Sequence, residues 1–159
     1  MSSSTQTPKA RRVARLALAA LFFTMATGQL SNVTGFIDIV ASYGLGGTTL
    51  AGLAATALIA GELTAAVGLV SRNETRRYRA ASVAVAVALA WGVLGTQAFA
   101  RGIALNNCGC FGVHAGQPLR WWALIEDVEF LALAWWVRAT AARTAISPST
   151  RSMVQVGAR

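Results

Sequence analysis

Four long apolar stretches limit what this chain can fold into. They cover residues 13–30, 45–70, 80–100 and 119–137. At about 1.5 Å of helix per residue, each can cross about 30 Å of hydrocarbon. Patterns of alternating polarity that would indicate β-strands are absent from the sequence. Because helices satisfy their own backbone hydrogen bonds in lipid, the sequence predicts an all-α protein, a four-helix transmembrane bundle.

The composition favours a lipid environment over a nucleic-acid partner. Hydrophobic residues make up 55% of the chain and charged residues 13%, whereas soluble domains carry roughly 25% charged residues. The net charge is +8, but the basic residues are grouped between the apolar stretches and are not interleaved with aromatic ones. The high content of Arg and Ala is typical of a high-GC bacterium. We therefore predict a multi-pass protein of the bacterial plasma membrane that binds no nucleic acid.

The positions of the 14 Lys and Arg residues predict how the bundle is oriented. Arg101 and Arg120 lie in the third loop, and the first loop has no basic residue. The other 12 flank the remaining ends of the apolar stretches: Lys9, Arg11, Arg12, Arg15, Arg72, Arg76, Arg77, Arg79, Arg138, Arg143, Arg151 and Arg159. The positive-inside rule then places both termini in the cytoplasm and the first and third loops on the exoplasmic side.

The chain divides into three predicted segments. Residues 1–12 form a disordered basic tail, residues 13–138 the membrane domain, and residues 139–159 a polar cytoplasmic tail. The first apolar stretch follows basic residues, as in a signal peptide, but no clear small-residue cleavage site precedes Gln29. We expect this stretch to remain in the protein as its first helix.

Both cysteines lie in the segment NNCGCFG, residues 106–112, within the third loop. They face the oxidising side of the membrane in the predicted orientation. An intramolecular disulfide can join only Cys108 and Cys110, and Gly109 gives the backbone the freedom to close so short a ring. Such a bridge removes almost no loop entropy and is strained, which makes it reducible. These features favour a redox-active pair over a structural bridge.

Two other interpretations of the cysteines stay open. They can be small, inert residues at the membrane interface. Alternatively, Cys108, Cys110 and His114 form the pattern C-x-C-x3-H, and thiolate with imidazole suits zinc or copper. His114 alone is more often an ordinary loop histidine.

Four carboxylic acids lie within apolar stretches: Glu62 in the second, and Glu126, Asp127 and Glu129 in the fourth. Tryptophan pairs at residues 121–122 and 135–136 bracket the fourth stretch, which places its acids near mid-membrane. A charge there costs at least about 2.5–3.5 kcal/mol, so we expect these side chains to face the bundle interior. They would line a proton path or a pocket for a small cofactor such as a quinone. The alternative is hydrogen bonding between helices that only holds the bundle together.

The sequence resembles the MauE/DoxX-like redox-associated membrane proteins, and the MauE type most of all, over about residues 13–138. The most specific element is the run Cys-Gly-Cys-Phe-Gly at residues 108–112, which includes Phe111. Phe36, Tyr43, Glu62-Leu63 and Gly68-Leu69 agree more weakly. The chain departs from the family pattern in three places. Glu126 stands where members often carry Arg, Gln29 stands in place of a common lysine, and a proline before the second-stretch glutamate is absent.

The resemblance implies a four-helix membrane bundle and exoplasmic thiol–disulfide exchange. MauE itself is implicated in maturation of the disulfide-rich small subunit of methylamine dehydrogenase, beside a thioredoxin-like partner. Carried over by position, Cys108 and Cys110 are the redox pair, and a thioredoxin-like protein or a thiol client is the partner. The same features also fit a non-catalytic assembly factor or anchor, and the metal-binding hypothesis remains a further alternative.

Overall fold

The computed structural model describes the backbone of residues 8–156 and the side chains of residues 8–143. The expectations for the outermost parts of both predicted tails, residues 1–7 and 157–159, lie outside the described residues. Within that range the chain forms helices and no strand: α1 (Pro8–Leu30), α2 (Val33–Ser42), α3 (Thr48–Val70), α4 (Glu74–Ala100) and α5 (Trp121–Val156). The prediction of an all-α protein is confirmed.

The helices are suited to a membrane. Among the described residues, α1, α3 and α4 are long and apolar enough to cross one. The fourth long helix, α5, carries Glu126, Asp127 and Glu129 in its first turns. The chain is thus a multi-pass membrane protein, and the predicted count of four spans stays a prediction.

Two of the predicted boundaries shift in the structure. α1 begins at Pro8, so residues 8–12 of the expected tail form its first turns. Proline is favoured at the first helical position, where its missing N–H leaves no hydrogen bond unmade. α5 continues beyond residue 137 to Val156, into the segment expected to be a polar tail.

The short helix α2 was not predicted. At 10 residues it is too short to span a membrane, so it lacks the long apolar stretch that predicts a spanning helix. Its N-cap is Asn32, whose side chain accepts a hydrogen bond from the Gly35 N–H at 2.9 Å. Phe36 and Val40 on this helix are fully buried, so α2 is part of the core rather than a loop.

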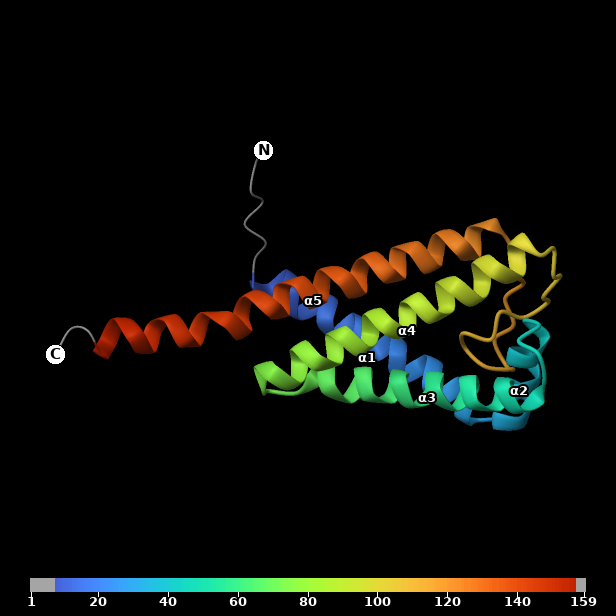
Figure 1. The fold of residues 1–159 in the computed structure, drawn as a ribbon, viewed down its shortest axis with the longest axis horizontal. Helices are drawn as coiled ribbons and strands as arrows, with labels where there is room; N and C mark the ends of the chain where they lie inside the picture. The colour runs from blue at the N-terminus through green and yellow to red at the C-terminus, as the bar shows by residue number, and fades with distance from the viewer. Residues whose placement is uncertain (1–7, 157–159) are drawn as a thin grey trace.

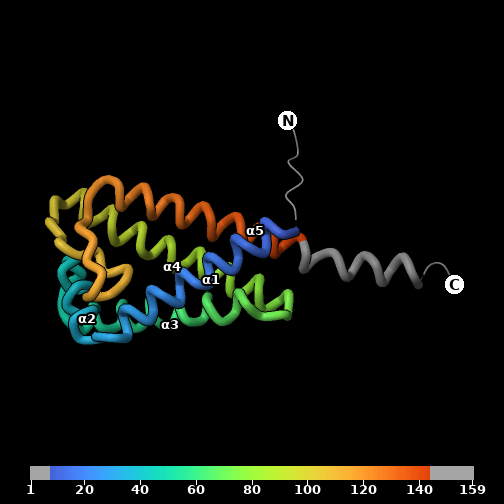
Figure 2. The backbone as a smooth tube through the Cα atoms, turned by 180° about the vertical axis from the view of Figure 1, so that it is seen from behind, coloured from blue at the N-terminus to red at the C-terminus, as the bar shows by residue number. Residues whose placement is uncertain are grey.

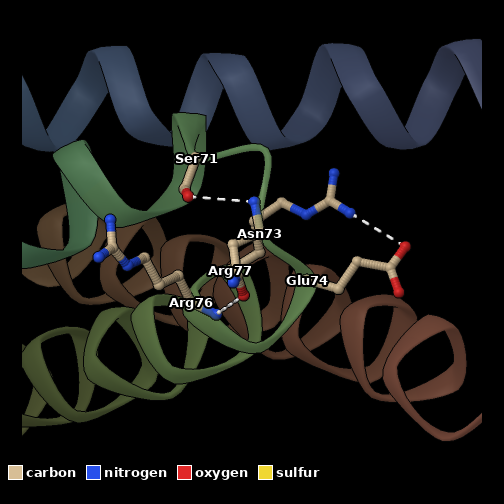
Figure 3. A network of polar contacts seen from close by, with 5 residues as sticks. All are labelled: Ser71, Asn73, Glu74, Arg76 and Arg77. Carbon is tan, nitrogen blue, oxygen red and sulfur yellow. Dashed lines mark hydrogen bonds and ion pairs between the residues drawn. The ribbon is translucent and has the colours of Figure 1, made fainter.

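The turn between α3 and α4 is closed by side-chain caps (Figure 3). The Asn73 side chain accepts from the Arg76 N–H at 3.1 Å, and Ser71 Oγ accepts from the Asn73 N–H at 3.2 Å. Arg77 pairs with Glu74 at 3.3 Å. Asn73 thus begins α4 directly after α3 ends, which folds the two helices into an antiparallel pair.

The long helices lie side by side with their connections gathered at two ends (Figures 1 and 2). α4 packs against α3 and α5, and α1 packs against α3. Close approach of α3 and α4 depends on Gly68, where a Cβ atom would collide with the Ala80 side chain. One end carries α2 and residues 101–120, and the other carries the start of α1 and the α3–α4 turn. The molecule therefore has two ends with different contents.

Candidate functional site

The two cysteines lie close together in the connection between α4 and α5. Their sulfur atoms are 3.4 Å apart and both are free thiols. Cys108 is 6% exposed and Cys110 is partly buried. Gly109 between them has φ +82°, and a Cβ there would press on Ile39 of α2. Glycine thus permits both the bend that brings the thiols together and the contact with α2.

The loop is fixed to α1 through backbone contact between two glycines. Gly112 has φ +74°, and a Cβ on it would collide with the Gly28 carbonyl. A Cβ on Gly28 would likewise collide with the Phe111 carbonyl. Asn107 also holds the loop: its Oδ1 accepts from the Gly109 N–H at 2.8 Å, and its Nδ2 donates to the Gly112 carbonyl at 3.0 Å. Sequence reasoning did not single out Asn107, although its place beside the cysteines was a signal.

Tyr43, at the end of α2, holds the loop from the other side. Its side chain is 1% exposed, and its hydroxyl donates to the Cys108 carbonyl at 2.7 Å. Gln97 of α4 donates to the Tyr43 carbonyl at 2.9 Å, and Arg101 donates to Gln97 Oε1 at 3.1 Å. Tyr43, weakly indicated by the resemblance, thus contacts the cysteine loop directly.

Beneath the loop lies a buried polar cluster of Gln29, Glu62 and Trp91, from α1, α3 and α4. Glu62 and Gln29 are fully buried. Glu62 Oε1 accepts from Gln29 Nε2 and from Trp91 Nε1, each at 3.0 Å. Gln29 Nε2 also lies 3.2 Å from the Cys110 carbonyl, to which it donates. One amide therefore connects the buried carboxyl group to the backbone of the second cysteine.

Gln29 and Trp91 are functional candidates that sequence reasoning missed. Gln29 was noted for standing where the family often has lysine but was given no role in the site, and Trp91 was not singled out. A glutamine within an apolar stretch is itself a signal, since a buried amide needs hydrogen-bond partners. The other Glu62 oxygen, Oε2, is buried and has no partner within the described part of the chain.

Both cysteines line a cavity of about 340 Å³ between the loop, α1, α4 and α5. Its remaining lining is Leu21, Met25, Tyr43, Trp91, Gly95, Phe111, Gln117, Leu119, Ala123, Glu126, Asp127 and Phe130. Glu126 Oε2 accepts from Gln117 Nε2 at 2.7 Å, and the Gln117 carbonyl accepts from the Cys108 N–H at 2.7 Å. The cavity is thus mostly apolar, with two thiols and two carboxyl groups on its wall.

The structure separates the other predicted site residues from this cavity. Glu62 is not part of its lining and reaches it only through Trp91 and Gln29. Glu129 is exposed on α5 and also lies outside the lining. His114 is exposed, and the described residues contain no group of three His, Cys, Asp or Glu side chains able to hold a metal. The ligand set of the metal hypothesis is therefore not brought together.

The two thiols differ in acidity because they share one hydrogen bond. That bond favours the thiolate of Cys108 and, against the opposing effect of burial, lowers its pKa to about 7. The same bond, together with burial, raises the pKa of Cys110 well above its ordinary value. The pair therefore loses its first proton near neutral pH, and Cys108 is the better nucleophile.

The fold and the site together define a multi-pass membrane protein with a dithiol loop held at one end of its helices. The chain belongs to the family of the methylamine utilisation protein MauE, whose family model matches residues 7–140. This match confirms the resemblance drawn from the sequence. No curated protein and no solved structure matches the chain.

Proposed function

We propose that this protein carries out thiol–disulfide exchange at the exoplasmic face of the bacterial plasma membrane, with Cys108 and Cys110 as the reacting pair. The observation that carries the proposal is the sulfur–sulfur distance of 3.4 Å in a loop fixed by backbone contacts. Preorganised thiols exchange readily because no chain rearrangement precedes the attack. Family membership and the open cavity beside the thiols support the same assignment.

The exchange needs a partner disulfide, and we assign this role to a thioredoxin-like protein or a client of the methylamine-utilisation type. The Cys108 thiolate attacks one partner sulfur, and the other partner sulfur leaves as a thiolate. Cys110 then loses its proton and attacks Cys108 Sγ, which breaks the mixed disulfide. The products are a Cys108–Cys110 disulfide and a reduced partner, so two electrons have passed to the partner. The same steps in reverse oxidise the partner.

The carboxyl groups around the site would accept the proton that Cys110 releases. Asp127 and Glu126 line the same cavity as Cys110, and Glu126 already accepts a hydrogen bond from Gln117, which supports Asp127 as the acceptor. Glu62 does not line the cavity and contacts the cysteine loop only through Gln29, so its ionisable group would act on the proton transfer indirectly. A quinone suits the cavity because the lining is mostly apolar and the volume lies within the range of small-ligand sites. When bound, it would supply a two-electron, two-proton acceptor for the dithiol.

The proposed orientation rests on the two ends of the bundle. The cysteine loop is at one end, and the start of α1 and the α3–α4 turn, with their basic residues, are at the other (Figure 1). By the positive-inside rule the basic end is cytoplasmic. A membrane-impermeant maleimide applied to intact, mildly reduced cells should label Cys108 or Cys110. Labelling that appears only after lysis would reverse the orientation.

Mixed-disulfide trapping tests the function itself. In a Cys110→Ser variant the attacking thiol remains and the resolving thiol is gone, so a Cys108-linked partner should accumulate and be identifiable by mass spectrometry. The matched control is Cys108→Ser, which should trap far less because Cys110 is the weaker nucleophile. A non-catalytic anchor predicts no covalent partner in either variant, and that result would refute the proposal.

A further inference from the structure

A second cavity, of about 470 Å³, lies at the end of the bundle opposite the cysteines. It is lined by the start of α1, the end of α3, the start of α4 and the middle of α5, which lie at the same end of the bundle in both views of the backbone (Figures 1 and 2). Four arginines line it: Arg11, Arg12, Arg15 and Arg77. Thr140 of α5 is also part of the wall.

Among the described residues, an acidic neighbour pairs with only one of the four arginines on this wall, Arg77. None of the lining residues in the described part of the chain is Asp or Glu. The Nε atoms of Arg11 and Arg15 are buried and have no hydrogen-bond partner among the described residues. Arg77 reaches Glu74 at 3.3 Å, on the exposed surface of the turn. Donors of this kind lose their hydration without gaining an acceptor, which is costly unless an anion occupies the space.

A nearby arginine shows the contrast. Arg138 of α5 donates to Ser82 Oγ and to the Tyr78 hydroxyl, each at 3.1 Å. Its guanidinium also lies over the rings of Tyr78 and Trp135, at 5.4 Å and 5.3 Å from their centroids. The protein itself supplies hydrogen-bond partners for Arg138, whereas the Nε donors of Arg11 and Arg15 have no partner among the described residues.

Membrane orientation alone does not require this arrangement. The positive-inside rule is met by basic residues anywhere near the cytoplasmic helix ends, as Arg72 and Arg79 show, since both are exposed and outside the cavity. The four arginines of α1 and α4 line one cavity, an arrangement that the positive-inside rule does not require.

We propose that this cavity binds a phosphate group. Guanidinium groups bind phosphate oxygens with paired, charge-assisted hydrogen bonds, and basic pockets between helices on the cytoplasmic side bind anionic lipid head groups. The phosphate can belong to an anionic phospholipid or to a free phosphate ion, because both present the same oxygens. The site is independent of the cysteine chemistry and does not rest on it.

Native mass spectrometry of the full-length protein in detergent, with equal amounts of phosphatidylglycerol and phosphatidylcholine, tests the lipid source. Equilibrium dialysis against labelled inorganic phosphate tests the free ion. The test variant is Arg11→Gln with Arg15→Gln, and the matched control, Arg72→Gln with Arg79→Gln, removes the same charge from exposed positions. Arg11→Lys with Arg15→Lys keeps the charge but loses the planar donor groups. Maleimide labelling of the cysteine loop checks that each variant keeps its orientation.

We expect retained phosphatidylglycerol to fall about tenfold in the glutamine test variant and to stay unchanged in the control, with the lysine variant in between. The same pattern for inorganic phosphate, without retention of phosphatidylglycerol, would identify the free ion and also support the site. Equal losses in test and control variants would mean diffuse attraction to charge. That result, or binding of neither probe, would overturn the proposal.

Discussion

Polar side chains are arranged differently at the two ends of this bundle. At the cysteine end, polar groups bind one another: Tyr43 holds the Cys108 carbonyl, and Gln29 joins Glu62 to the Cys110 carbonyl. At the arginine end, donors converge on an open space and two Nε atoms have no partner among the described residues. The first arrangement fixes a geometry and the second leaves room for an occupant. The cysteine end also has two buried oxygens without a partner among the described residues, Oε2 of Glu62 and Oε1 of Gln29, but its cavity is mostly apolar, whereas four arginines line the cavity at the other end.

The loop contact with α1 provides the strongest test of rigid placement at the cysteine end. Gly112→Ala and Gly102→Ala both put a side chain at positive φ, +74° and +68°, which costs about 1–2 kcal/mol. A Cβ on Gly112 would also collide with the Gly28 carbonyl of α1, whereas a Cβ on Gly102 would have nothing within 4 Å. We expect Gly112→Ala to lower the free energy of unfolding in mixed micelles by about 2 kcal/mol more than Gly102→Ala. Equal losses would mean that the loop is not locked against α1.

The helices were largely predictable from the sequence, whereas the contacts of the site were not. The ends of α1 and α3, at residues 30 and 70, coincide with the ends of apolar stretches, because burial in lipid dictates both. α2 was missed because length is the main signal of a spanning helix. The pairing of Gln29 with Glu62 depends on how α1 and α3 pack, which a single sequence does not encode locally.

The predicted acids illustrate the same limit. Glu126, Asp127 and Glu129 are close in sequence and were grouped by that closeness. The rotation of α5 turns Asp127 towards Gly95 and the cavity and leaves Glu129 exposed. The two cysteines lie close together in space, as expected for residues separated only by Gly109. The hydrogen bonds that join the cysteine loop to Gln29 of α1 and to Tyr43 could not be predicted from the sequence.

The hydrogen bond between the thiols predicts a pH profile. Alkylation of reduced Cys108 should rise with pH and reach half its maximum near pH 7, because the thiolate reacts and its pKa is lowered to about 7. Cys110→Ala removes the bond that stabilises the thiolate, so the midpoint should move up by about one pH unit or more. Cys110→Ser keeps a donor and should move it less. An unmoved midpoint in Cys110→Ala would show that the pair does not share a proton.

The buried polar cluster predicts a smaller kinetic effect. Glu62→Gln keeps an oxygen that can accept from Gln29 and Trp91, and removes only the ionisable group. Reduction of the Cys108–Cys110 disulfide by dithiothreitol should slow by about tenfold, less than for a group in direct contact. Glu129→Gln, the same substitution at an exposed position, should leave the rate unchanged. A wild-type rate in Glu62→Gln would leave this acid with only a packing role.

The smallest expected effect is the shift in the alkylation midpoint of Cys108 when one charge is removed, either near the cysteines or at the opposite end of the bundle. Asp127 lines the cavity with Cys108, and a negative charge there raises the pKa of that thiol, so Asp127→Asn should lower the alkylation midpoint by about half a pH unit. Arg15→Gln alters a charge at the opposite end of the bundle, far beyond the Debye length of about 10 Å at 0.1 M salt, and should not move it. Peptide-resolved alkylation of both variants at the same ionic strength makes the measurement. If Arg15→Gln shifts the midpoint as much as Asp127→Asn, the two ends are electrostatically coupled and cannot be treated as separate sites.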